Sequence, residues 1–204
     1  ANLFRIIGVF GDQTKVISAK SIGSIVWDTN GSNTWSSSSL NTYLNGEYLT
    51  SLGTLADKIA TTTWKVGGGS WANIASSVPK TAYQYEVGSY ASTRTYAAKI
   101  GLMYVTDYYY SASPSAWTLV GYNESDATKD YRAAKTTNWL FSGQEWTISR
   151  NSDDSDNAFL VINRGYVNIN SVDFGYHVRP SFNLLSSTTY VSGSGSMSDP
   201  VRIN

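Results

Sequence analysis

The chain has 204 residues, and its 15 basic side chains balance 15 acidic ones, so its formal net charge is zero. This balance excludes the basic surface typical of nucleic-acid-binding proteins and a polybasic run for a membrane surface. The lack of cysteine excludes disulfides, thiolate nucleophiles and zinc–cysteine sites. The length predicts a single domain over residues 1–204, with a core large enough to fold without cross-links.

Charged residues make up only 15% of the chain, below the roughly 25% of typical soluble domains. Uncharged polar residues fill the difference, together with 15 Tyr and 7 Trp. This mixture is common in extracellular binding proteins, whose aromatic rings contact sugars or protein surfaces. No apolar run approaches the roughly 20 residues of a membrane span, and no signal peptide is recognisable. We therefore expect a mature or truncated piece of a longer protein, with its targeting signal outside this sequence.

The N-terminal residues predict a β-hairpin, and further short strands follow it. Residues 3–10 and 14–18 have strand character on either side of a turn at Gly11-Asp12. The most clearly predicted strand lies at the centre of the chain, over residues 99–105. The other strand-like segments are residues 24–27, 58–64, 146–149, 157–163, 167–170 and 199–203.

Helical character is concentrated early in the chain. The serines at 36–39 are candidate N-caps, and Leu40, Tyr43 and Leu44 recur at helical spacing. Asn45-Gly46 is expected to end this helix, and a second short helix is expected through residues 48–52. The many later strands then predict an α+β fold with loop-rich antiparallel sheets and short helices in the N-terminal half.

Three further segments predict loops or weak helices. Residues 67–69 form a glycine loop, which lacks the Gly-Lys-Ser/Thr sequence of a phosphate-binding loop. Residues 107–112 predict a loop or a short turn of helix, and residues 126–135 are polar with helical potential.

The segment from Gly175 to Leu184 predicts a strand that closes the fold. Its apolar residues alternate, as in a half-buried strand. Pro180 removes a backbone donor, so this strand is expected at a sheet edge or with an irregularity. Arg179 has two readings: a structural contact with loop carbonyls or a carboxylate, or a contact with an anionic ligand.

The chain resembles an uncharacterised domain family of surface and pilus-associated proteins from Gram-positive and related bacteria. The resemblance covers nearly the whole chain, and its more specific parts are Gly101-Leu-Met-Tyr104 and Val178-Arg-Pro180. Other shared pieces are Phe4-Arg-Ile-Ile-Gly8, Ile25-Val-Trp-Asp28, Asn138-Trp-Leu140, Trp146-Thr-Ile148 and Asp199-Pro200.

That family is in turn similar to the C-type-lectin-like superfamily, which includes the formylglycine-generating-enzyme fold. The resemblance implies a C-type-lectin-like domain of two sheets, with its terminal strands 3–10 and 200–203 paired. The cysteines that carry catalysis in the enzyme branch do not exist in this chain.

The sequence offers few combinations of residues that are suited to catalysis. His177 is the single histidine, and no Gly-x-Ser-x-Gly elbow accompanies it, so a structural role is favoured. A glycosidase needs two carboxylates about the bond that it cleaves, and no spacing singles out a pair. The carboxylates considered for that role are Glu47, Glu86, Asp107, Glu124 and Glu145.

The one acidic cluster lies between two predicted strands. Asp153, Asp154 and Asp156, with loop carbonyls, offer the oxygen ligands that calcium prefers. The segment lacks the glycine and distal glutamate of a helix–loop–helix calcium site. Calcium is therefore one reading, and a solvated turn is the other.

Three consecutive tyrosines mark the candidate ligand surface. Aromatic faces stack on sugar rings and anchor protein interfaces. We expect Tyr109, Tyr110, Trp117 and Tyr122, in the loop from Asp107 to about Trp139, to form such a surface. The other reading of the tyrosines is that they cover the core beneath this loop.

The sequence thus predicts a non-enzymatic, extracellular binding or adhesion module whose partner is a glycan or a cell-surface protein. One alternative is a structural subunit or decoration of a bacterial surface filament, in contact with copies of itself. A second alternative is a cysteine-free hydrolase.

Overall fold

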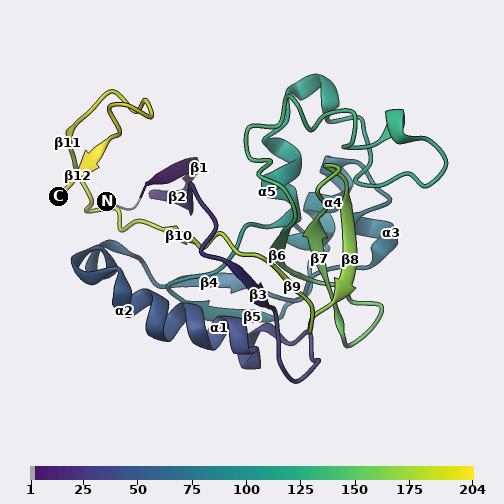
Figure 1. Ribbon diagram of the computed structural model, residues 1–204, viewed down its shortest axis with the longest axis horizontal. Helices are drawn as coiled ribbons and strands as arrows, with labels where there is room; N and C mark the ends of the chain where they lie inside the picture. The colour runs from purple at the N-terminus through teal and green to yellow at the C-terminus, as the bar shows by residue number, and fades with distance from the viewer. Residues whose placement is uncertain (1–2) are drawn as a thin grey trace.

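The computed structural model describes residues 3–204, which form an α+β domain of short strands in open sheets, with few and short helices (Figure 1). The largest sheet has five strands in the order β3–β9–β6–β7–β8. Neighbouring strands are antiparallel except β6 and β9, which are parallel. These strands are β3 (Ser24–Val26), β6 (Glu145–Arg150), β7 (Asn157–Val161), β8 (Val167–Ser171) and β9 (Gly175–His177).

The predicted N-terminal hairpin is confirmed. β1 (Phe4–Phe10) and β2 (Gln13–Ser18) are antiparallel, and Gly11 at the turn has a φ of 64° that favours glycine. β10 (Ser181–Asn183) pairs with the other edge of β2. The hairpin thereby becomes part of a three-stranded sheet.

The expected pairing of the two terminal strands is wrong. β1 pairs with β2, whereas the C-terminal β12 (Arg202–Ile203) pairs with β11 (Tyr190–Ser192). The β11–β12 hairpin lies at one end of the molecule, in yellow in Figure 1. A short β11 closer in sequence therefore takes the place that β1 was expected to fill.

The early helical segment continues beyond its predicted end. Ser38 is the N-cap and accepts a hydrogen bond from Asn41, as expected. Asn45-Gly46 does not end the helix, because the chain continues through a π-helical turn. The Asn45 amide instead donates to the Ile100 carbonyl and so ties the helix to the core. The consecutive elements are α1 (Ser39–Tyr43), η2 (Leu44–Tyr48), α2 (Leu49–Ser51) and η3 (Gly53–Lys58).

The predicted central strand over residues 99–105 is also wrong. Before Val105 this segment makes a single bridge, between Gly101 and Ser181, and at Val105 it enters helix α5 (Val105–Tyr110). The carboxylate of Glu86 accepts the backbone N–H groups of Val105 and Thr106, which start this helix. A buried side chain distant in sequence thus overrides the local strand preference.

The remaining helices are short. Residues 126–135 contain only the turn η5 (Ala127–Lys129), followed by irregular turns. β4 (Thr62–Lys65) and β5 (Thr95–Ala98) form a separate two-stranded sheet. The other helical elements are η1 (Trp35–Ser37), α3 (Trp71–Ile74), α4 (Pro79–Glu86) and η4 (Pro114–Ala116).

The predicted closing strand from Gly175 to Leu184 is divided between two sheets, and the break includes Pro180, where an irregularity was expected. β9 ends at His177 in the five-stranded sheet, and β10 begins at Ser181 in the three-stranded one. Between them the buried Arg179 donates from Nε to Glu145 Oε2 at 2.6 Å and from Nη2 to the Leu140 carbonyl at 2.6 Å. The structural reading of Arg179 is therefore confirmed.

The interior contains two clusters of buried side chains. One is built around Trp27, Trp35, Trp64 and Trp146, and the other includes Tyr108, Tyr109 and Tyr131. Within residues 3–204, no helix has the length and apolar character needed to cross a membrane.

Candidate functional site

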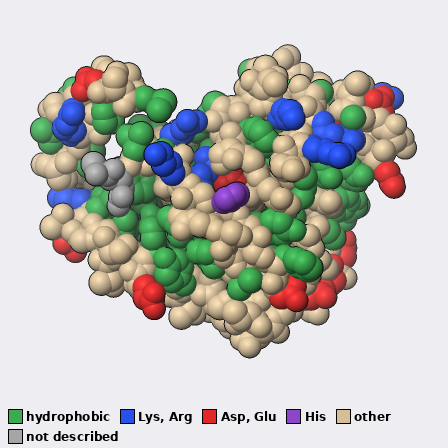
Figure 2. Space-filling view, in the orientation of Figure 1, with side chains coloured by type: hydrophobic (Ala, Val, Ile, Leu, Met, Phe, Trp, Pro, Cys, Tyr) green, Lys and Arg blue, Asp and Glu red, His purple; other side chains and the backbone are tan. Residues whose placement is uncertain are grey.

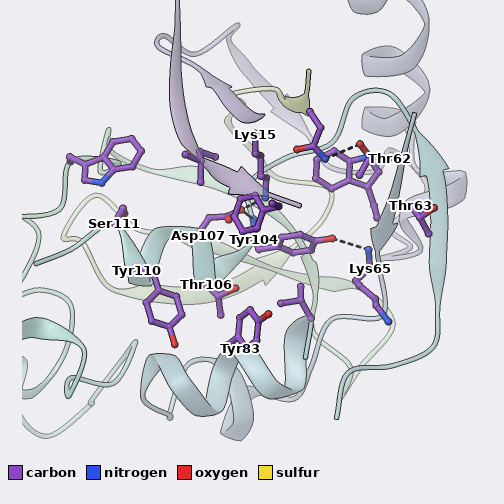
Figure 3. Close-up of a pocket in the computed structure, with 16 residues that line it drawn as sticks. Lys15, Thr62, Thr63, Lys65, Tyr83, Tyr104, Thr106, Asp107, Tyr110 and Ser111 are labelled. Carbon is purple, nitrogen blue, oxygen red and sulfur yellow. Dashed lines mark hydrogen bonds and ion pairs between the residues drawn. The ribbon is translucent and has the colours of Figure 1, made fainter. Parts of the chain in front are cut away.

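A cleft of about 460 Å³ lies between the β1–β2 hairpin, strand β4 and helices α4 and α5 (Figure 3). We call it the aromatic cleft. Apolar and aromatic side chains line it, together with hydroxyl groups and one ion pair. Its volume lies in the roughly 300–1,000 Å³ range of small-molecule sites. The polar lining residues are Lys15, Thr62, Thr63, Lys65, Thr106, Asp107, Ser111 and Asn183.

An ion pair forms the floor of the aromatic cleft. Lys15 Nζ from β2 lies 2.5 Å from Asp107 Oδ2 in α5, and both side chains are largely buried. The same carboxylate oxygen accepts the Tyr104 N–H at 2.7 Å and so caps α5. The Lys15 ammonium also lies 4.5 Å from the centre of the Tyr104 ring and 5.5 Å from that of Trp64. The opposite charges of Lys15 and Asp107 therefore balance each other, and the contacts with Tyr104 and Trp64 hold both side chains in place.

Tyr104 contributes a hydroxyl group to the cleft. Its oxygen accepts the Lys65 N–H at 2.8 Å, a contact drawn in Figure 3. Burial raises the pKa of this phenol well above its ordinary value, so it stays protonated at neutral pH. Among residues 3–204 the Tyr104 hydroxyl has no acceptor for its own hydrogen. A bound ligand with an oxygen acceptor would supply one.

The rim of the aromatic cleft carries exposed rings from four segments. Phe10 is 55% exposed, Tyr83 43%, Tyr110 38% and Trp139 42%. Tyr83 on α4 and Tyr110 on α5 meet edge to face, with ring centres 6.4 Å apart. Large rings left in solvent beside a concave site are the usual anchors of a ligand.

Of the four predicted ligand residues, one lines the cleft and a second packs against that one. Tyr110 lines the cleft, and Trp117 packs edge-on against it at 5.0 Å, partly exposed. The assignment of Tyr109 is wrong, because its ring is fully buried and its hydroxyl donates to the Ile74 carbonyl. Tyr122 packs against Trp71 and Tyr166, and does not line the cleft.

Sequence reasoning missed Lys15, Tyr104 and Tyr83, and placed Trp139 only at the boundary of the ligand loop. These residues come from β2, the turn before α5, helix α4 and the segment before β6. No local pattern unites them, because only the tertiary contacts bring them to one cavity. The available signal was Tyr104, which ends the specific Gly101-Leu-Met-Tyr104 piece.

The acidic turn is held by protein donors. The Asp154 carboxylate accepts from Asn151 Nδ2 at 2.6 Å and from Asn157 N at 2.9 Å. Asp153 accepts the Trp71 N–H, and Asp156 accepts from Asn157 Nδ2. Within residues 3–204 no group of three acidic or histidine side chains has the arrangement of a metal site. These contacts favour the solvated structural turn over calcium.

The groups considered for catalysis do not converge on the aromatic cleft, which among them only Asp107 lines. His177 is exposed, and its Nδ1 lies 3.2 Å from Ser21 Oγ; the histidine is visible in purple in Figure 2. Glu86 and Glu145 are buried in structural hydrogen bonds, whereas Glu47 and Glu124 are exposed elsewhere. Asp107 is the sole carboxylate among the described residues that line the cleft.

The fold and the cleft define the class of protein: an α+β domain with a preformed, aromatic-lined cavity. The chain belongs to the family described as Domain of unknown function (DUF6273), whose model matches residues 12–186. This match includes β2 to β10 and leaves out β1 and the β11–β12 hairpin. Comparison with curated proteins and with solved structures gave no match.

Proposed function

We propose that this domain is a non-enzymatic binding module of a bacterial cell surface, which recognises a glycan or a cell-surface protein through the aromatic cleft. The observation that carries the proposal is the ring of exposed aromatic side chains around a rigid polar floor. The cleft lies beside the loop that the sequence marks for ligand binding, and Tyr110 belongs to both.

A glycan suits the chemistry of the cleft better than an apolar ligand. Tyr110 and Trp139 offer rings for the C–H faces of a sugar. Thr63 and the Tyr104 hydroxyl offer partners for sugar hydroxyls. A hydrolytic role has less support, because Asp107 is paired with Lys15 and, among residues 3–204, no second carboxylate lines the cavity.

The proposal includes a C-type-lectin-like fold. Its support is the set of short strands in open sheets and the long irregular segment between α5 and β6, which borders the cleft. The switch from β9 to β10 around Arg179-Pro180 is the structural counterpart of the Val178-Arg-Pro180 piece. Extracellular localisation follows from the same resemblance and from the polar, aromatic composition.

Replacement of both Tyr110 and Trp139 by alanine is expected to reduce binding to glycans or to cells more than tenfold. Each truncation of an anchor ring costs about 1 kcal/mol or more, and about 1.4 kcal/mol corresponds to tenfold in affinity. The measurement is a glycan array and a cell-binding titration, each with calcium and with chelator.

Phe174→Ala is the control, because Phe174 is an exposed aromatic residue, at 57%, that does not line the cleft. Unchanged binding by the double variant would overturn the cleft as the ligand site. Turnover of a bound glycan would support the hydrolase alternative instead.

A second candidate function is a structural subunit of a surface filament. One observation favours it: β1 is an edge strand with exposed apolar side chains, including Ile6 at 57% and Val9 at 67%. Sedimentation velocity over a range of concentrations is expected to show assembly that Val9→Lys removes. A wild-type protein that stays monomeric at high concentration would contradict this function.

A further inference from the structure

A second cavity lies beyond the end of β4, where the chain runs through three glycines. It has a volume of about 350 Å³, and its lining is more polar than that of the aromatic cleft. We call it the glycine hollow, and its lining includes Gly67, Gly68, Tyr90, Arg94 and Arg150. The aromatic cleft shares none of these residues.

Two guanidinium groups line the glycine hollow, and among residues 3–204 no carboxylate lines it. Arg150, at the end of β6, is half-buried, and its Nη2 donates to the Asp154 carbonyl at 3.1 Å. The Arg94 side chain is exposed and makes no hydrogen bond to residues 3–204. In the described part of the chain, neither arginine has an acidic group within the 4.0 Å of a salt bridge.

The two arginines lie close enough to act on each other. Burial lowers the pKa of Arg150 and the positive charge of Arg94 lowers it further, against a smaller opposite effect of the Asp154 carboxylate. Like charges that share a partly desolvated cavity repel, and an anion between them would relieve this repulsion. Arginine is also the residue best suited to bind a planar carboxylate or a sulfate group through two parallel hydrogen bonds.

The glycines keep the wall of the hollow close to these side chains. A Cβ on Gly67 would lie 2.2 Å from the Ser92 Cβ, and a Cβ on Gly68 would lie 1.9 Å from the Arg150 carbonyl oxygen. The N–H groups of Gly67 and Gly68 donate no hydrogen bond to the residues described, 3–204. Such free backbone donors are a common supplement to arginine in anion sites.

An aromatic surface borders the hollow. Tyr90 is 68% exposed, and its ring centre lies 5.3 Å from that of Tyr85. Exposed tyrosine rings offer a platform for the face of a sugar. A ligand that combines an anionic group with a sugar ring would use both features of the site.

We propose that the glycine hollow binds an acidic saccharide, with its carboxylate or sulfate group between Arg94 and Arg150 and its ring beside Tyr90. This site is separate from the aromatic cleft and stands whether or not the cleft binds a ligand. The contact is non-covalent, and selectivity for acidic over neutral sugars is its expected property.

The test is calorimetric titration of the whole chain with three oligosaccharides of equal length: sulfated, uronic-acid and neutral. We expect binding of at least one acidic probe and at least tenfold weaker binding of the neutral one. Arg94→Gln is expected to weaken the affinity for the acidic probe about tenfold or more, since it removes a charged hydrogen-bond donor. Its melting temperature should remain that of the wild type, because Arg94 makes no side-chain contact that folding needs.

Arg164→Gln is the matched control, because it removes the same charge from an exposed position outside the hollow. The proposal is overturned if neither acidic probe binds, if the neutral probe binds as tightly as the acidic ones, or if both variants lose affinity equally. The Tyr110→Ala/Trp139→Ala variant should retain acidic binding. Loss of that binding would assign the acidic probe to the aromatic cleft and would also overturn the proposal.

Discussion

Replacement of Arg179 by methionine is expected to lower the free energy of unfolding by about 3–5 kcal/mol. Arg179 and Glu145 are both almost fully buried, and the guanidinium donates to both oxygens of that carboxylate. The variant leaves Glu145 buried without its partner and leaves the Leu140 carbonyl without a donor. Denaturant unfolding followed by fluorescence measures the loss.

The double variant Arg179→Met/Glu145→Leu separates the unpaired charge from other effects. Since it removes both charges, it should recover most of the lost stability. Low pH should also reduce the difference in unfolding free energy between Arg179→Met and the wild type. Burial raises the pKa of the Glu145 carboxyl, and the loss of Arg179 removes an opposing effect, so the carboxyl of the variant becomes neutral as the pH falls. Equal losses in the single and double variants would contradict the argument.

Replacement of Glu86 by alanine is expected to cost at least about 3 kcal/mol of unfolding free energy. This buried carboxylate accepts two backbone N–H groups, of Val105 and Thr106, and the hydroxyls of Thr106 and Ser149. Alanine leaves these donors buried without an acceptor. Since they hold the start of α5, which carries Asp107 and Tyr110, binding in the aromatic cleft should weaken as well.

The pH dependence of stability gives an independent test of Glu86. Burial raises the pKa of its carboxyl above the ordinary 4.5, although its hydrogen-bond donors act in the opposite direction. The folded state therefore holds this proton more tightly than the unfolded chain. The resulting stabilisation is complete below about pH 4.5 and is lost as the pH rises through the raised pKa.

We therefore expect the unfolding free energy of the wild type to decline from pH 4.5 towards neutrality more steeply than that of Glu86→Gln. Glutamine is the control, because it keeps the size of the side chain and does not titrate. Parallel profiles for the two proteins would show that Glu86 has the same pKa in both states.

Local sequence signals succeeded where neighbouring residues determine the structure. The hairpin follows from two strand-like runs around Gly11, and the start of α1 follows from the Ser38 cap. The change of sheet at Pro180 follows from its missing donor. In each case the cause and the effect lie within a few residues of each other.

The predictions were wrong where a residue distant in sequence determines the local structure. Residues 99–105 have strand-like side chains, but Glu86 holds the N–H groups that start a helix at Val105. Tyr109 carries the same side chain as Tyr110, yet it points into the core, whereas Tyr110 reaches the cleft. Adjacent helical positions point about 100° apart, so a run of tyrosines does not show which ring is exposed.

The sequence by itself determined the α+β class, the absence of cysteine chemistry and the hairpin, whereas it left two readings of Arg179 open. Only the tertiary structure decided which residues meet in a cavity. The aromatic cleft joins Lys15 to Asp107 across 92 positions, and the glycine hollow joins Arg94 to Arg150. Composition and local spacing predict which groups a chain offers, but packing between remote segments determines which of them meet.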